Sequence, residues 1–148
     1  MNQASHASAP DMSGRGYLIV RVSTARGAIP IEGARVTIRT HEPEAEIRGV
    51  VIRVLVSNRD GNTETIALPA PPRAASMDPY GELPFTTYNI DVEKSGYYPL
   101  YFSNVPVYDT ITSIQPAVLI PISENGNTDN ATRDNGIFNE TSNPNLRA

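Results

Sequence analysis

Short segments that alternate between apolar and polar side chains, divided by glycine and proline, are the feature that most restricts the fold of this chain. Residues 16–24 and 87–93 alternate with a period of two, which is the period of a strand with one buried face. The side chains predicted to face the core are Leu18, Val20, Val22, Tyr88, Ile90 and Val92. No helical heptad or internal repeat is visible. The pattern therefore predicts an all-β protein.

Further strands are predicted on both sides of the glycine and proline positions. Residues 33–38 resume the alternation after Gly27 and Pro30, with Ala34, Val36 and Ile38 on one face and Val36 predicted to be buried. We expect this strand to pair with residues 16–24. Residues 50–57 form a β-branched run, and Asp60-Gly61 predicts a tight hairpin turn to a returning strand at 63–68. Two more strands are predicted within 97–107 and 114–122, where prolines indicate edge or terminal positions.

The length of 148 residues suits one domain with a single core. The alternating segments span residues 16–122. A polar segment, 1–15, precedes them, and an almost wholly polar tail, 123–148, follows. A tail of this composition cannot build a core of its own. We therefore expect one sandwich domain with extended polar segments at both ends.

Several function classes are disfavoured by composition. The formal charge is −4 and the 12 basic residues are dispersed, so no nucleic-acid partner is expected. No run of about 18 apolar residues is present, so no membrane insertion is expected. Residues 1–14 contain no apolar stretch typical of a signal peptide. If the protein acts outside the cell, we expect either a removed leader or release by another route, such as lysis.

Groups that would suggest catalysis are sparse. His41 lies beside Glu42, Glu44 and Glu46, but their spacing matches no recognised metal site. Asp91 and Glu93 share one strand face, which is predicted to face solvent. The chain is therefore predicted to have no catalytic residues, no metal and no cofactor, and not to be an enzyme.

Three tyrosines close together, Tyr97, Tyr98 and Tyr101, suggest an alternative role in glycan contact. An aromatic face packs against the apolar face of a sugar while the hydroxyl group forms hydrogen bonds. The competing interpretation is that tyrosine is common at the edges of β-sandwiches. The sequence leaves both readings open.

The segment Pro30-Ile-Glu-Gly-Ala-Arg-Val36 resembles the Pro-x-x-Gly-Ala-x-Val signature that opens carboxypeptidase-regulatory-like (transthyretin-like) domains. The turn at Asp60-Gly61 and the segment 88–97 are similar to the next landmarks of that family, in the same order. The resemblance covers about residues 16–122. It implies a prealbumin-like Greek-key β-sandwich of about seven strands, with Gly33 and Ala34 where two backbones approach closely.

A narrower resemblance is carried by residues 67–72, the Gly96-Tyr97 pair, and the runs at 104–108 and 114–116. These are similar to the N-terminal non-catalytic domain of clostridial spore cortex-lytic and peptidoglycan-binding proteins. In those relatives a hydrolase or wall-binding domain is joined to the module. Here a polar tail follows it, so the resemblance implies fold landmarks and not an active site.

Within the tail, Ile137, Phe138 and Leu146 are the apolar residues able to anchor on a neighbouring molecule. An extended segment can add to an open sheet edge of another copy. We therefore predict a non-catalytic structural subunit that self-assembles into an extracellular or spore-surface filament or similar appendage, with itself as partner. The alternative is a cell-wall or carbohydrate-binding accessory module with a glycan partner. A hydrolase is the third and least favoured reading.

Overall fold

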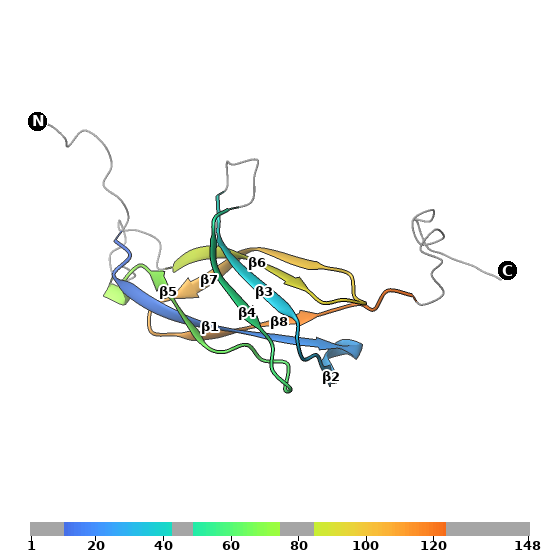
Figure 1. The fold of residues 1–148 in the computed structure, drawn as a ribbon. Helices are drawn as coiled ribbons and strands as arrows, with labels where there is room; N and C mark the ends of the chain where they lie inside the picture. Colours follow the sequence, from blue (N-terminus) through green and yellow to red (C-terminus); the bar gives the residue numbers. More distant parts are fainter. Residues whose placement is uncertain (1–10, 43–48, 75–84, 124–148) are drawn as a thin grey trace, which may run out of the picture.

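The computed structural model describes residues 11–42, 49–74 and 85–123, which form two β-sheets packed face to face (Figure 1). In chain order the elements are β1 (Gly14–Thr24), the short 3-10 turn η1 (Ala25–Gly27), β2 (Ile29–Pro30), β3 (Arg35–Thr40), β4 (Val51–Val56), β5 (Ile66–Ala70), β6 (Phe85–Glu93), β7 (Leu100–Tyr108) and β8 (Thr112–Val118). The predicted all-β sandwich is confirmed. The described residues form eight strands in place of about seven, because the two-residue strand β2 was not predicted.

Each sheet has a simple order. In the first sheet β1 is central, with antiparallel β5 and β2 along one side and parallel β8 along the other. The second sheet is antiparallel throughout, in the order β4-β3-β6-β7. In Figure 1, β3 and β4 cross β1 and β8 steeply, and the start of β1 and the segment after β8 lie at opposite ends of the long axis.

The predicted pairing of residues 16–24 with residues 33–38 is wrong, because β1 and β3 belong to different sheets. Ala25, Arg26 and Gly27 have positive φ angles of 54°, 60° and 94°, which reverse the chain after β1. The chain pairs back with β1 over β2 alone and then crosses to the second sheet. Although they lie in different sheets, β1 and β3 both bury their apolar sides in the core between the sheets.

The predicted hairpin at Asp60-Gly61 is also wrong in its partners, although the turn itself forms. Gly61 has a φ of 84°, and the side chain of Asn58 accepts the N–H of Asp60 at 2.8 Å. A Cβ on Gly61 would lie 2.3 Å from the carbonyl oxygen of Val22, so β1 packs directly against the turn. The turn carries the chain from β4 in one sheet to β5 in the other, which is a crossover.

The core lies between the facing sides of the two sheets. Burial was predicted for Val20, Val36, Ile90 and Val92, and all four are fully buried. The largest other fully buried side chains are Leu18, Val22, Ile38, Ile66, Leu68, Val107 and Leu119. Aliphatic residues from both sheets therefore form one continuous core.

Asp91 corrects the prediction of a solvent face. The alternation correctly predicts that the Asp91 side chain points away from the core. The residue is nevertheless only 5% exposed. Arg39 from the neighbouring strand donates its Nε–H to Oδ2 of Asp91 at 3.0 Å. Its cross-strand neighbours are Thr37 and Tyr101. The carboxylate is therefore covered by the side chains beside it and is held as part of a structural ion pair.

The family resemblance predicts that both Gly33 and Ala34 lie where two backbones approach closely, and the structure agrees for Ala34 only. Ala34 is fully buried, and its N–H is donated to the hydroxyl of Ser57 at 2.9 Å. Gly33 is exposed, so the predicted close approach is wrong for this residue. Its φ of 82° explains the glycine instead, because side chains disfavour that conformation.

Ala34→Leu is expected to destabilise the fold by roughly 1–3 kcal/mol, because the larger side chain has no space in a fully packed site. Urea unfolding monitored by circular dichroism measures the effect. Ala67→Leu, on an exposed position of β5, is the matched control and should change the free energy of unfolding by less than about 0.5 kcal/mol. Equal stability of the two variants would contradict the packing around Ala34.

Asp109, in the turn between β7 and β8, ties three segments together. Its Oδ1 accepts the N–H of Arg15 at 3.0 Å, and its Oδ2 accepts the N–H of Arg73 at 2.7 Å. These hydrogen bonds, that of Arg73 first, lower the pKa of Asp109. The start of β1 and the segment after β5 are thereby fixed to the end of β7.

Asp109→Asn is expected to remove a pH-dependent part of the stability. Because the pKa of Asp109 is lower in the folded chain, its contribution is fully present above the unfolded pKa of about 3.9. That contribution is lost as the pH falls through the lower folded value. Thermal unfolding of wild type and variant should therefore differ at about pH 6 and converge toward about pH 2.5. A difference that stays constant over this range would show that the charge has no part in it.

Candidate functional site

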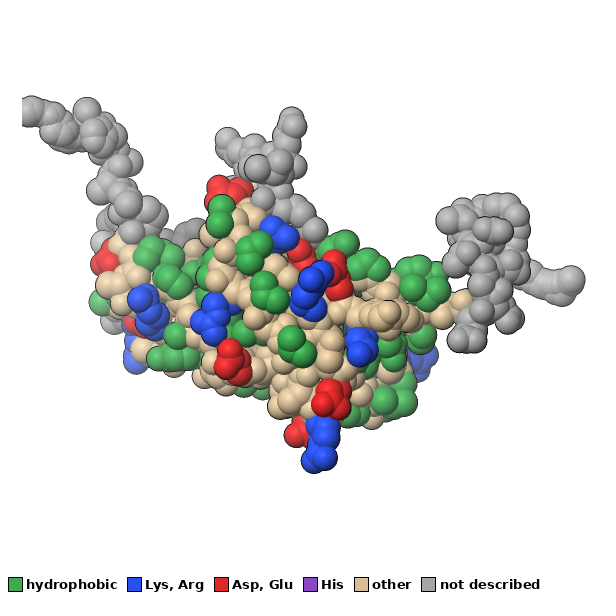
Figure 2. Space-filling model, viewed as in Figure 1, with side chains coloured by type: hydrophobic (Ala, Val, Ile, Leu, Met, Phe, Trp, Pro, Cys, Tyr) green, Lys and Arg blue, Asp and Glu red, His purple; other side chains and the backbone are tan. Residues whose placement is uncertain are grey.

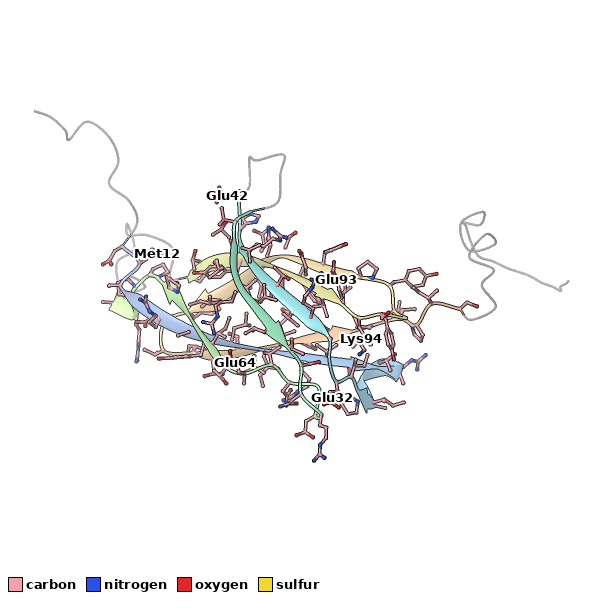
Figure 3. All side chains as sticks on the ribbon, in the orientation of Figure 1. Met12, Glu32, Glu42, Glu64, Glu93 and Lys94 are labelled. Carbon is pink, nitrogen blue, oxygen red and sulfur yellow. The ribbon has the colours of Figure 1, made fainter. Side chains whose placement is uncertain are left out.

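Part of the predicted site lies outside the described residues. This applies to the tail residues Ile137, Phe138 and Leu146, and to Glu44 and Glu46 of the acidic segment. His41 and Glu42 are described, and His41 Nδ1 lies 3.1 Å from Oδ1 of Asn89. Glu42 projects beyond the end of β3, far from Glu93 and Lys94 (Figure 3). Over the described ranges no group of three or more His, Cys, Asp or Glu side chains is placed to hold a metal ion.

Prolines divide the edge strands into two kinds. Five strands pair on one side only: β2, β4, β5, β7 and β8. Four of them contain a proline, namely Pro30 in β2, Pro69 in β5, Pro106 in β7 and Pro116 in β8. Proline blunts an edge because it has no N–H to offer to another strand. Among the described edge strands, β4 alone lacks this protection.

The free edge of β4 can be oriented from hydrogen bonds at its end. The N–H of Ser57 is donated to the carbonyl of Ala34 at 3.0 Å, so the backbone of Ser57 faces the β3 side. Backbone direction alternates along a strand, and the N–H and C=O groups of Val54 and Val56 therefore face away from β3. In the described part of the chain β4 pairs with β3 alone. These backbone groups are open to a further strand.

The side chains of β4 are unusually apolar for an exposed edge. Val54 is 55% exposed and Val56 is 61% exposed, and Val50 and Val51 are exposed as well. Figure 2 shows hydrophobic side chains on this side of the molecule, interleaved with charged ones. An exposed edge strand with apolar side chains is a site where another chain can add. We call Val51–Val56 with its free backbone groups the β4 edge.

A groove of about 390 Å³ runs beside the β4 edge. Its lining residues are Val54, Leu55, Val56, Asn58, Asn62 and Glu64. Arg53, the charged residue of β4, forms an ion pair with Glu64 at 3.1 Å. The one charge on the strand is thus offset by a partner just before β5, and the groove keeps apolar and hydrogen-bonding walls.

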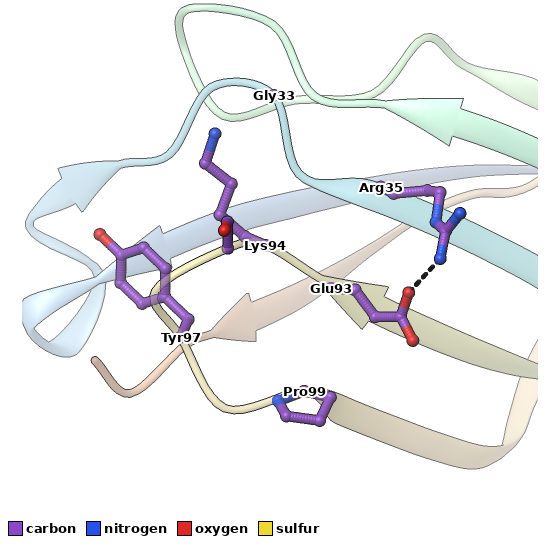
Figure 4. Close-up of a pocket in the computed structure, with 7 residues that line it drawn as sticks. Gly33, Arg35, Glu93, Lys94, Tyr97 and Pro99 are labelled. Carbon is purple, nitrogen blue, oxygen red and sulfur yellow. Dashed lines mark hydrogen bonds and ion pairs between the residues drawn. The ribbon is translucent and has the colours of Figure 1, made fainter. Parts of the chain in front are cut away.

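A second cavity, of about 520 Å³, opens at the end of the same sheet where β6 turns into β7 (Figure 4). It is lined by Gly33, Arg35, Glu93, Lys94, Ser95, Tyr97 and Pro99. Arg35 and Glu93 are cross-strand partners whose side chains form an ion pair, and this pair raises the pKa of Arg35. We call this space the turn cavity.

The turn cavity contains one of the three tyrosines predicted to contact glycan. Tyr97 lines it, and its ring packs partly against the core. Tyr98 and Tyr101 do not line it, and both are exposed. Sequence reasoning missed Arg35 and Lys94. The signal for Lys94 was its place in the predicted turn 94–96, whereas the pairing of Arg35 with Glu93 depends on a strand register that the pattern left open.

No helix in the described portion of the chain has the length and apolar character needed to cross a membrane.

Comparison with known proteins finds similarity among solved structures only, at low sequence identity. No protein-family profile and no curated protein sequence matches it. Among solved structures it is similar to chlorocatechol 1,2-dioxygenase from Pseudomonas putida, with a TM-score of 0.47 and 14% identity over 74% of this chain and 61% of that one. It is also similar to 3-chlorocatechol 1,2-dioxygenase from Rhodococcus opacus, with a TM-score of 0.49 and 8% identity over 74% of this chain and 61% of that one.

A minor pilin of Streptococcus agalactiae is similar at a TM-score of 0.42, with 12% identity over 74% of this chain and 46% of the pilin chain. The chain thus spans about three-fifths of the two dioxygenases, at 61%, and less of the pilin. At these values the similarities carry no argument about activity. The class that the structure itself defines is an all-β sandwich domain.

Proposed function

We propose that this chain is a non-catalytic structural subunit that assembles with copies of itself into a filament or similar appendage outside the cell or on a spore surface. The observation that carries the proposal is the β4 edge, an apolar edge strand without proline whose backbone groups face outward. The occupant of this edge is an extended segment of a second copy. The resemblance to carboxypeptidase-regulatory-like modules, and the narrower one to clostridial spore proteins, agree with a non-catalytic role.

The polar tail 123–148 supplies the added segment in this proposal. The described chain leaves the sandwich after β8, at one end of the long axis (Figure 1). The tail sequence includes Ile137, Phe138 and Leu146, and burying one such side chain is worth about 1.5–3 kcal/mol. Backbone hydrogen bonds along the β4 edge would give affinity, and the groove beside it would receive the apolar side chains.

Donor and acceptor are different surfaces, which determines the kind of assembly. A contact between two unlike surfaces is heterologous, and it generates an open filament unless the rotation between copies closes a ring. A contact of one β4 edge with another would be isologous and would stop at a dimer. The proposal therefore specifies growth beyond a dimer.

Val54→Lys in the full chain tests the proposal, because a lysine on an exposed edge blocks strand addition at little cost to the fold. Wild type should show species larger than a dimer by light scattering after size exclusion, and filaments by electron microscopy. Val54→Lys should be a folded monomer. Val118→Lys, an exposed valine on β8, is the matched control and should assemble like wild type. A wild-type chain that stays monomeric at high concentration, or a Val54→Lys variant that assembles normally, would overturn the proposal.

A further inference from the structure

The turn cavity combines positive charge with an aromatic wall on a chain whose net charge is negative. Arg35 and Lys94 contribute two positive charges and Glu93 one negative charge, so the cavity carries a local excess of one positive charge. The whole chain has a formal charge of −4. A positively charged site on an acidic protein favours anionic ligands at that site, because the negative charge of the rest of the surface repels anions.

Lys94 is placed to meet a ligand. Within the described residues its ammonium group makes no hydrogen bond or ion pair, whereas Arg35 is bound to Glu93. The ammonium lies beside the turn at Gly33, where a Cβ would be 3.0 Å from Nζ (Figure 4). The absence of a side chain on Gly33 therefore gives the ammonium its place at the cavity rim.

Tyr97 gives the cavity a flat wall. Its ring lies opposite the Arg35–Glu93 pair in Figure 4 and packs partly against the core from behind. A tyrosine ring presents an apolar face and a hydroxyl group that forms hydrogen bonds, which together suit the face and edge of a pyranose. The volume of about 520 Å³ falls in the range of small-molecule sites.

The walls are held in place before any ligand arrives. The N–H of Tyr97 is donated to the carbonyl of Lys94 at 3.0 Å, which closes the turn. The N–H of Tyr98 is donated to Ile120, and the N–H of Ile122 to Gly96, both at 2.9 Å. These bonds attach the turn to the segment after β8. A site ordered in advance loses less freedom on binding.

We infer that the turn cavity binds an acidic saccharide, with the carboxylate at Lys94 and the exposed side of Arg35 and the sugar ring against Tyr97. A neutral sugar would leave Lys94 without a partner, and a simple anion would make no use of the aromatic wall. Glu93 accepts hydrogen bonds from sugar hydroxyl groups in this arrangement. Arg35 is the cross-strand neighbour of Val56, but the cavity shares no lining residue with the β4 edge or its groove. Loss of saccharide binding and loss of assembly are therefore tested with different residues and are distinguishable.

Titration of the isotope-labelled full chain by amide NMR tests the inference, with D-glucuronate, D-glucose and acetate as probes. Glucuronate should shift the amides of Gly33, Lys94, Ser95 and Tyr97, with a Kd of about 1–10 mM and at least about tenfold tighter than either other probe. Added salt should weaken binding. Equal affinity for acetate would show that the cavity binds anions without recognising the sugar ring. Equal affinity for glucose would show that charge has no part in binding. Either result, or the absence of any shift at about 50 mM glucuronate, would overturn the inference.

Variants of the lining separate binding from folding. Lys94→Gln and Tyr97→Leu should each weaken glucuronate binding about tenfold, while Lys94→Arg keeps most of it. Tyr98→Leu, next to the site but not lining it, is the matched control and should bind within about twofold of wild type. Circular dichroism checks that each variant is folded. Unchanged binding by folded Lys94→Gln would contradict the role of the ammonium group.

Discussion

Replacing Ile90 by alanine is expected to lower the free energy of unfolding by about 2–5 kcal/mol. Ile90 is fully buried on β6, a central strand of its sheet, where it pairs with Ile38 on one side and Phe102 on the other. Truncation removes apolar contacts and leaves a cavity that rigid strands on both sides cannot close. Chemical denaturation with the m-value compared between variants measures the loss.

Val118→Ala is the control for that measurement, because it shortens an exposed side chain of the edge strand β8, away from the β4 edge. It should change the free energy of unfolding by no more than about 0.5 kcal/mol. A small effect at Ile90 as well would mean that the two sheets do not close on one tightly packed core.

A chain that ends at Ile122 is expected to fold and to lose assembly entirely. The last core residue is Leu119, and the N–H of Ile122 still reaches the carbonyl of Gly96 at 2.9 Å, so truncation leaves the described contacts intact. Circular dichroism should report the same β signal and a similar melting temperature. Light scattering and electron microscopy should detect no species beyond the monomer, because the donor segment is gone.

Substitution of both Ile137 and Phe138 by serine in the full chain is the matched variant, since it keeps the length of the tail and removes two apolar anchors. It should also fail to assemble. Normal polymers from the truncated chain would show instead that assembly uses the sandwich faces or the segment 1–15, and the tail would lose its proposed role.

The faces of the strands followed from sequence, whereas their partners did not. Val20, Val36 and Ile90 are buried as their alternation indicates. Successive side chains of a strand point to opposite faces, so an apolar residue at every second position identifies the face that is buried. Alternation carries no information about which strand lies next in a sheet. The pairing of β1 with β3 and the hairpin at Gly61 both failed for this reason, since neighbours in sequence packed across the core and not side by side.

Burial of Asp91 and the composition of the turn cavity were beyond sequence reasoning for a related cause. Arg39 covers Asp91, and Arg35 meets Glu93, only because the register of β3 and β6 places them opposite or diagonal to one another. Tyr97 was predicted as a contact residue on aromatic character alone. The β4 edge had a readable signal, the absence of proline in residues 51–56, but its meaning depended on knowing which strands lie at an edge.

Hydrogen exchange at the amides of Val54 and Val56 tests the central claim most directly. Both N–H groups face away from β3, so they should exchange quickly in a monomer. In the chain that ends at Ile122 both amides should exchange quickly. In the Val54→Lys monomer the amide of Val56 should exchange quickly. In assembled wild type they should be strongly protected, because an added strand accepts their hydrogen bonds. Fast exchange at both amides in assembled protein would contradict strand addition at the β4 edge.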